Sequence, residues 1–173
     1  MRRSKISTVL ALAGVGLCAA ACGSGNTTGT ETITGMVTGT AAVAGAPTIP
    51  LRLTGPVRTT ASITLRTGTT KNRLVTFKTP DGNFVVRHTK TKVGHELMIM
   101  CKVKYLTTAT YTVLGSRGTG KFTGAKGGGK LSITFQGNLP KLSNDQCEST
   151  KIRPAEKGAV IMFYASGPLT VGK

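Results

Sequence analysis

A glycine-rich segment near the middle of the chain has the spacing of a phosphate-binding loop. The stretch GSRGTGK, from Gly115 to Lys121, fits the pattern G-x-x-x-x-G-K, in which backbone amides and a lysine contact phosphate oxygens. The next residue of that pattern is Ser or Thr, whose hydroxyl binds Mg²⁺, whereas here it is Phe122. The segment also runs between expected strands and opens no helix whose N-terminus could face phosphates. We therefore predict no nucleotide site here.

The residue types that bind metals or catalyse proton transfer are scarce and scattered. His88 and His95 are the only histidines, and Glu96 follows the second. A metal site needs three or four convergent ligands, which this spacing does not supply, so we predict no metal and no cofactor. A carboxylate pair for acid–base catalysis needs two carboxyl groups facing one cleft, and nothing in the sequence requires that arrangement, so we predict no catalytic residue. The acids beyond the first 21 residues are expected mostly in turns or loops, and they are Glu31, Asp81, Glu96, Asp145, Glu148 and Glu156.

The four cysteines divide between the start of the chain and its second half. Cys18 and Cys22 lie in or beside an apolar leader, which leaves Cys101 and Cys147 as an even pair. In an oxidising compartment such a pair is expected to form a disulfide. The two positions are 46 residues apart, unlike the closely paired ligands of zinc sites. We predict the disulfide, with a metal site or a catalytic thiol as the alternatives.

The first 21 residues have the parts of an export signal. Arg2, Arg3 and Lys5 form a cationic start, and an uncharged, mainly apolar run follows over residues 6–21. That run is shorter than the roughly 20 apolar residues of a transmembrane helix. We predict a cleaved leader over 1–21, a flexible tether over 22–30 and one domain over 31–173.

The end of the leader, LCAAACGSG over residues 17–25, resembles the lipobox of bacterial lipoproteins. In that family small residues precede a cysteine that receives acyl chains, palmitate among them, and becomes the mature N-terminus. The resemblance implies cleavage after Ala21, lipid on Cys22 and a place on the extracytoplasmic face of the cell membrane. The family prefers Leu where this chain has Ala19. Because Ala19 to Ala21 also suits ordinary signal peptidase, secretion as a soluble protein is the alternative.

The chain is strongly basic. It has 23 Lys and Arg against 6 Asp and Glu, and three of the basic residues lie in the leader, so 20 remain and the mature net charge is +14. Such a field attracts anionic lipids and anionic wall polymers. With 3 Tyr, 5 Phe and no Trp, the chain offers few stacking platforms, so specific nucleic-acid binding is not expected. The alternative is that the lysines only solubilise a β protein and protect its edges.

Alternation of apolar and polar residues predicts an all-β domain. Val57, Ala61, Ile63 and Leu65 share one parity, and residues 97–105 and 130–136 repeat the pattern. The sequence PDGN from Pro80 predicts a tight hairpin. Further strands are expected at 31–38, 49–54, 72–79, 83–89, 108–114 and 158–166.

These strands, about eight or nine in number, predict a single antiparallel β-barrel, with a β-sandwich as the alternative. Pro50 should place its strand at an edge or a bulge. Residues 158–166 are apolar on both parities, so this strand is expected to be covered on both faces.

The glycine-rich segment also carries a resemblance. Residues 116–129, SRGTGKFTGAKGGG, look like the "GGTGxFxGAxGxG" stretch of allene oxide cyclase-like and dirigent-like β-barrels. The likeness covers about residues 115–137 and departs from the family where Ser116 or Arg117 replaces the usual first glycine. It implies a glycine corner with Phe122 packed inside a barrel and no catalytic residue in the segment, so no activity is carried over.

Together these features predict an exported, membrane-anchored lipoprotein of the cell envelope, a non-enzymatic module whose basic surface contacts anionic envelope components. A second hypothesis is a carrier that holds a small apolar ligand in the barrel lumen. A third is an enzyme such as a cyclase or isomerase, in which His88 or Tyr105 would be the first groups to examine. Lumen volume separates the first two, and the expected inward side chains are Val57, Ala61, Ile63, Leu97, Ile99, Val103, Leu131, Ile133 and Phe135.

Overall fold

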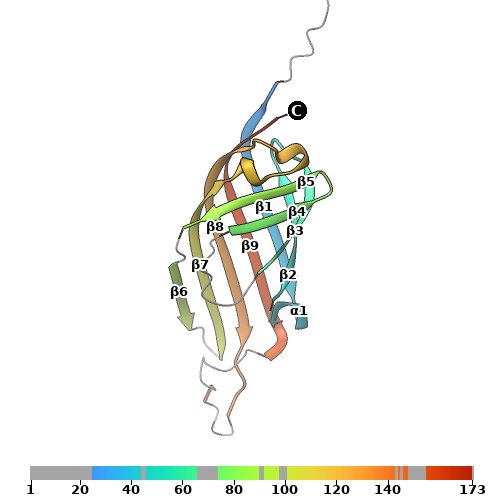
Figure 1. The fold of residues 1–173 in the computed structure, drawn as a ribbon. Coiled ribbons are helices and arrows are strands. Elements are labelled where there is room, and N and C mark those ends of the chain that lie inside the picture. The colour runs from blue at the N-terminus through green and yellow to red at the C-terminus, as the bar shows by residue number, and fades with distance from the viewer. Residues whose placement is uncertain are drawn as a thin grey trace, which may run out of the picture.

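The computed structural model shows a closed antiparallel β-barrel of eight strands and almost no helix (Figure 1). The predicted barrel is therefore confirmed. The structure describes residues 25–43, 46–65, 74–89, 92–97, 101–142, 144, 146–147 and 155–172; among residues 43, 92–97 and 155–157 the burial is described only for Lys92 and Gly94.

The described elements are almost all strands, with three short helical turns between them. In chain order they are β1 Thr27–Thr38, α1 Thr40–Val43, β2 Thr48–Thr54, β3 Thr59–Thr64, β4 Leu74–Thr79, β5 Gly82–His88, β6 Lys92–Leu97, β7 Lys102–Val113, η1 Gly115–Arg117, η2 Gly120–Phe122, β8 Lys126–Asn138 and β9 Ala155–Val171.

The strand order explains how the barrel closes. The sheet runs β5-β4-β3-β2-β1-β9-β8-β7, and β5 then pairs with β7 from Val86 opposite Val113 to His88 opposite Tyr111. Strand β6 pairs with the other part of β7 and stays outside the ring. We call the end of the barrel where β1 begins the upper end, and the opposite end, where β7 begins, the lower end; they lie at the top and bottom of Figure 1.

Alternation places one parity of each strand inside. In β2, for example, Ile49, Leu51 and Leu53 are buried while the residues between them are exposed. The centre of the barrel is aromatic: the rings of Phe84 and Phe122 lie 5.4 Å apart, and Phe77 lies 5.2 Å from Phe84 and 5.9 Å from Phe163. Such tilted and edge-on ring pairs add stabilisation to the area that they bury. Phe122, which the resemblance placed inside, is fully buried.

Glycine is required where β8 crosses β9 near the upper end. A Cβ atom on Gly129 would lie 2.1 Å from the carbonyl oxygen of Ser166, and one on Gly167 would lie 2.0 Å from that of Gly128. No side chain fits at such distances, so glycine allows the two backbones to approach. The last glycines of the expected glycine corner thus belong to strand β8, which begins at Lys126.

One predicted strand is wrong. Residues 97–105 do not form a single strand, because β6 ends at Leu97 and β7 begins at Lys102 with the opposite direction. Cys101 occupies the turn with a φ of 63°, a conformation that non-glycine residues rarely adopt. The alternation continues across this turn without glycine or proline, so the sequence carries no signal of a reversal. Met98, Ile99 and Met100 lie outside the described residues.

Three further expectations change, which concern the coverage of β9, the position of Pro50 and the start of the first strand. Strand β9 is covered on one face only, because Met162 and Tyr164 are exposed while Ile161 and Phe163 are buried. Burial in the barrel therefore does not explain the apolar side chains of Met162 and Tyr164. Pro50 lies in an interior strand, not at a sheet edge. The pairing of β2 with β1 ends at Leu51, so the missing N–H of Pro50 costs no bond in that ladder.

Residues 27–30, expected in the tether, already belong to β1.

Candidate functional site

The barrel interior contains one buried carboxyl group among the described side chains, that of Glu31 on β1. The side chain is 1% exposed, and its Oε2 accepts the backbone N–H of Val57 at 3.0 Å; the carboxyl group also accepts the N–H of Thr54. Among the described atoms, Oε1 has no hydrogen-bond partner. A Cβ on Gly55 would lie 3.1 Å from Oε2. Glu31 therefore holds the β2–β3 turn against the upper end of the barrel.

The expectation that the acids lie mostly in turns or loops is wrong for Glu31, and also for Glu96 and Glu156, whose backbones lie in β6 and β9. Glu31 shares the inward parity of Ile33, at the start of the strand that the sequence predicted. The alternation of inward and outward residues along this strand is therefore the sequence signal that could have indicated that Glu31 is buried.

Burial governs the protonation of Glu31 and of nearby Tyr111 on β7. Desolvation raises the pKa of the Glu31 carboxyl, and the bonds from Val57 and Thr54 oppose the rise only in part. Desolvation, together with the negative charge of Glu31, raises the pKa of Tyr111 to about 12. Both groups therefore favour their neutral forms inside the barrel, as expected where charge loses its hydration.

We expect the carboxyl group of Glu31 to make stability depend on pH. Because its pKa is higher in the folded than in the unfolded protein, the folded state keeps a proton that the unfolded chain releases, and stability falls as pH rises between the two values. Glu31→Gln removes this loss, so urea unfolding should show the variant gaining on the wild type as the pH rises from about 4 towards neutral. The gain is about 1.4 kcal/mol for each unit by which the folded pKa is raised.

The control for this measurement is Asp81→Asn. Asp81 is exposed enough for its ion pair with Lys121 to be screened, so this change should cost under about 1 kcal/mol. A stability difference between Glu31→Gln and the wild type that stays constant across this pH range would contradict the prediction.

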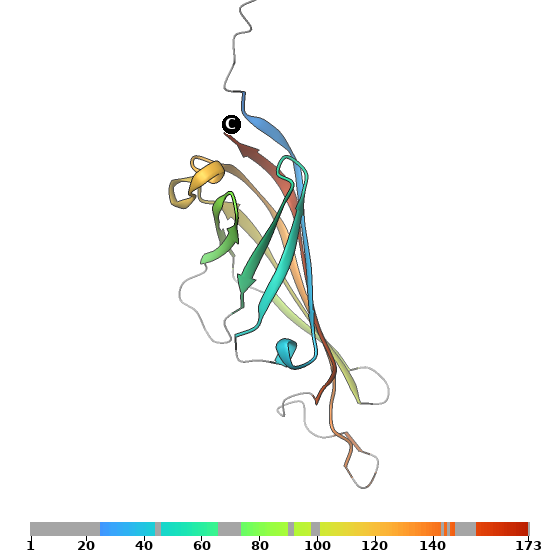
Figure 2. The ribbon, with the colours of Figure 1, turned by 90° about the vertical axis from the view of Figure 1, so that its right-hand side faces the viewer.

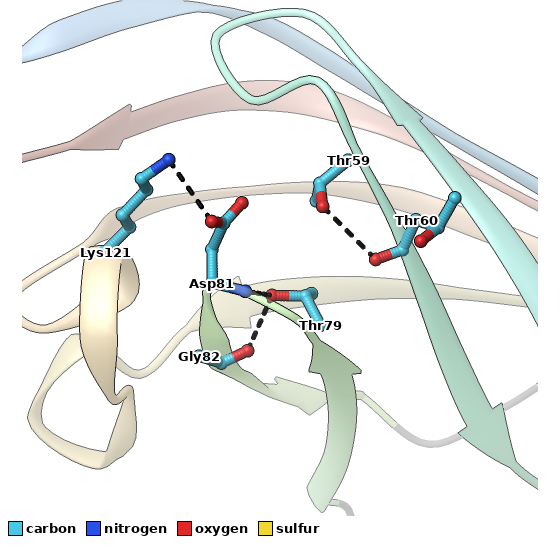
Figure 3. A network of polar contacts seen from close by, with 6 residues as sticks. All are labelled: Thr59, Thr60, Thr79, Asp81, Gly82 and Lys121. Carbon is cyan, nitrogen blue, oxygen red and sulfur yellow. Dashed lines mark hydrogen bonds and ion pairs between the residues drawn. The ribbon is translucent and has the colours of Figure 1, made fainter.

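The glycine-rich segment that resembles a phosphate-binding loop is bound to the β4–β5 hairpin. The N–H of Lys121 donates to the carbonyl of Asp81 at 3.0 Å, and its Nζ lies 3.3 Å from the Asp81 carboxylate (Figure 3). The N–H of Asn83 donates to the Thr119 hydroxyl at 2.9 Å, and the N–H of Thr119 donates to the Asn83 carbonyl at 3.0 Å. The amides of Thr119 and Lys121 are thus used within the protein, and the segment closes the barrel by inserting Phe122.

The hairpin itself has the predicted turn. The Thr79 hydroxyl accepts the N–H of Asp81 at 3.1 Å and donates to the Gly82 carbonyl at 2.7 Å, as Figure 3 shows. Gly82 has a φ of 128°, which only glycine adopts readily. This confirms the hairpin expected from PDGN.

The groups named for an enzyme hypothesis do not converge. His88 lies at the end of β5, where its Nδ1 is 2.7 Å from the Thr89 carbonyl oxygen. Tyr105 lies on β7 with its ring 6.0 Å from that of Phe135, in a small cluster at the lower end. The side chain of His95 lies outside the described part of the chain. Within that part, no three His, Cys, Asp or Glu side chains gather as metal ligands would.

The predicted disulfide between Cys101 and Cys147 is confirmed. The Cα atoms are 5.2 Å apart, and the bond joins the β6–β7 turn to the segment that follows β8. Cys101 is buried with Val103 and Leu139, and the N–H of Leu139 donates to the Cys101 carbonyl at 2.7 Å. The disulfide therefore anchors the lower end of the molecule, far from Glu31 at the upper end.

The described exterior is strongly basic. The only acids whose side chains are described are Glu31, which is buried, and Asp81, which pairs with Lys121. Exposed cations occur on strands β2, β4, β5, β6, β7 and β8 and on the connections between strands: Arg52, Arg58, Lys78, Arg87, Lys92, Lys102, Arg117, Lys121, Lys126, Lys130 and Lys141.

An open cavity of about 310 Å³ lies at the lower end, near the start of β7. None of its lining residues belongs to the aromatic centre of the barrel, and Val103 has the only apolar side chain among them. They are Lys102, Val103, Gln136, Gly137, Asn138 and Gly158. This lining suits water or a polar group better than an apolar ligand.

Compared with known proteins, the chain matches no family model, no curated protein and no solved structure. Ala21, Cys22 and the leader lie outside the described residues. In the part of the chain that is described, no helix has the length and apolar character needed to cross a bilayer.

Proposed function

We propose that this protein is an exported, lipid-anchored module of the cell envelope that binds anionic envelope components through its basic exterior, without catalysing a reaction. The observation that carries the proposal is the positive charge of the described surface. Its many exposed lysines and arginines are balanced by a single described surface carboxylate, that of Asp81, which already pairs with Lys121. Such a surface attracts phosphate-bearing lipids and polymers over several ångströms.

The aromatic centre favours this proposal over a carrier of an apolar ligand. Four phenylalanine rings, each within 6 Å of a neighbour, pack inside the barrel, so the space where a lumen ligand would bind is taken by side chains. The leader supports the anchored location, because the stretch that ends at Cys22 resembles a lipobox.

The electrostatic part of the proposal is tested with vesicles. The chain from residue 22 onward contains every strand of the closed barrel, so the unacylated Cys22→Ala form of this mature chain isolates the contribution of the surface. We expect it to bind vesicles that contain phosphatidylglycerol, to ignore purely zwitterionic ones, and to dissociate by about 0.5 M salt, where the screening length is about 4 Å. Equal binding to both kinds of vesicle would overturn the proposal.

The anchor is tested in cells. Wild-type protein should sediment with membranes even in high salt, whereas Cys22→Ala should be released by the salt wash. A Cys22→Ala protein that resists the wash as the wild type does would show that no lipid on residue 22 holds it.

A further inference from the structure

Four exposed apolar side chains lie together on one outer face of the barrel. Met36 on β1 is 57% exposed, Met162 and Tyr164 on β9 are 36% and 50% exposed, and Leu106 on β7 is 41% exposed. We call this group the Met–Tyr patch. Surface strands in water normally carry polar outward residues, so an apolar patch across several strands indicates a contact.

The register of the strands brings these four residues into one area. Met36 stands directly opposite Met162, and Thr134 on β8 separates Met162 from Leu106. Directly opposite residues of antiparallel strands have Cβ atoms about 5 Å apart. Tyr164 follows Met162 on the same face of β9 and stands opposite Thr34. The patch therefore spans one face of β1, β9, β8 and β7, with Thr134 between Met162 and Leu106.

Cations border the Met–Tyr patch on three sides. In the row of paired residues that contains Tyr164, Arg52 of β2 lies at one end and Lys92 of β6 at the other. Lys130 of β8 stands opposite Ser166, one outward position above Tyr164. All three side chains are exposed. In this face, the described side chains include no acid; the side chain of Glu96, whose backbone pairs with Lys104, is outside the described set.

The apolar patch and the cations around it together favour one kind of binding partner over another. A second copy docked on the same face would bring the three cations against their equivalents, and like charges in contact are unfavourable. An anionic lipid bilayer complements both features, because lipid phosphates meet the cations while methionine, leucine and tyrosine enter the interfacial region.

The position of the chain's start is consistent with the same occupant. Strand β1 supplies Met36 and also leads back to residue 22, five residues before Thr27, a reach of about 17 Å. Met36 lies nine residues further along β1, about 30 Å from Thr27. A barrel standing upright on its anchor would hold the patch away from the membrane, whereas a barrel lying on β1 and β9 brings the anchor and the patch to one surface.

We propose that the face formed by β1, β9, β8 and β7 lies flat on an anionic lipid bilayer, with the Met–Tyr patch inserted and Arg52, Lys92 and Lys130 against the phosphates. The inference rests on the proposed function and names its partner and its contact face. Figure 2 shows β1 and β9 side by side on the side of the barrel opposite the β4–β5 hairpin, so that hairpin would face away from the membrane.

Tryptophan reporters test which face touches lipid, because the chain has no Trp of its own. We introduce each reporter into the unacylated mature chain. One is Tyr164→Trp, in the patch, and the other is Thr76→Trp, at an exposed position of β4. With phosphatidylglycerol vesicles, we expect the emission of the Tyr164→Trp reporter to shift to shorter wavelength and to be quenched by brominated acyl chains. The emission of the Thr76→Trp reporter should not change.

Point variants then test the apolar contact. Met36→Ser with Met162→Ser should weaken vesicle binding by about tenfold or more, since two large apolar side chains lose their burial. Leu142→Ser is the matched control, because Leu142 is 43% exposed but lies outside this face near the disulfide, and it should bind as the wild type does.

The outcomes separate this inference from the proposed function. Vesicle binding with unchanged emission from the Tyr164→Trp reporter, or equal shifts at both reporters, would overturn the contact face and leave the basic module standing. An emission shift in the Tyr164→Trp variant that depends on protein concentration without vesicles would assign the patch to a second copy instead. If the protein without any patch substitution shows no salt-sensitive binding to anionic vesicles, both proposals are overturned.

Discussion

Replacing Phe122 with alanine is expected to lower the free energy of unfolding by about 3–5 kcal/mol, the range for removing a fully buried aromatic side chain. Phe122 is fully buried, and the centre of its ring lies 5.4 Å from that of Phe84. The ring of Phe84 in turn packs against Phe77, which contacts Phe163. Urea denaturation followed by circular dichroism measures the loss. Because small domains are stable by only about 5–15 kcal/mol, the variant would lie near the limit of folding.

The cost of losing Phe122 has a second part. The ring attaches the glycine-rich segment to the barrel, and that segment bonds the β4–β5 hairpin through Thr119 and Lys121. A cavity at residue 122 should therefore loosen both, and amide exchange at Lys121 and Asn83 should accelerate more than exchange in β9. Thr123→Ala, an exposed neighbour, is the control and should change stability by less than about 0.5 kcal/mol. A Phe122→Ala protein as stable as this control would contradict the structural role assigned to the ring.

The architecture could be predicted because its signals are local. Alternation in 49–54 and 57–65 reports which residues share a face, and PDGN defines its turn through residues next to one another. The disulfide followed from the number of cysteines and their compartment. None of these inferences needs to know which strands pair at a distance.

The remainder depends on contacts between residues far apart in sequence. The closure of the ring by β5 and β7 and the opposition of Met36 to Met162 are set by strand registers that no local pattern encodes. For β9, a residue on the outer parity looks the same in sequence whether another layer of protein covers it or a partner does, so the sequence alone predicts that this strand is covered on both faces. The burial of Glu31 escapes sequence analysis for a related reason. Acidic side chains are mostly exposed, and only the closed barrel reveals that the inward parity of β1 is shielded from water.

The turn before Cys101 shows a different limit. Tight turns are usually recognised from glycine, proline, asparagine or aspartate, and the residues from Leu97 to Lys102 include none of them. The conformation of Cys101 is held by distant partners instead, namely the disulfide to Cys147 and the bond from the N–H of Leu139. A turn stabilised in this way has no local signature, although its cysteine was correctly paired.

Removal of the disulfide is the second change with a large expected effect. Cys101→Ala with Cys147→Ala should lower the free energy of unfolding by roughly 4 kcal/mol, because the bond closes a loop with a sequence separation of 46 and the opened chain gains entropy when unfolded. The loop contains β7 and β8, which carry many of the pairings of the ring. Denaturant unfolding of the variant and of the oxidised wild type gives the difference.

Reductant supplies the matched control for the disulfide. Dithiothreitol should destabilise the wild type by about the same amount as the double substitution, and it should leave the variant unchanged, since no other described cysteine remains to be reduced. If reduced and oxidised wild type unfold at the same denaturant concentration, the bond does not stabilise the fold. Vesicle binding by the folded variant should stay close to wild type, because the Met–Tyr patch and its cations lie on β1, β2, β6, β7, β8 and β9 rather than on the segment after β8 that holds Cys147. A loss of binding that exceeds the fraction unfolded would instead place part of the lipid contact at the lower end of the barrel.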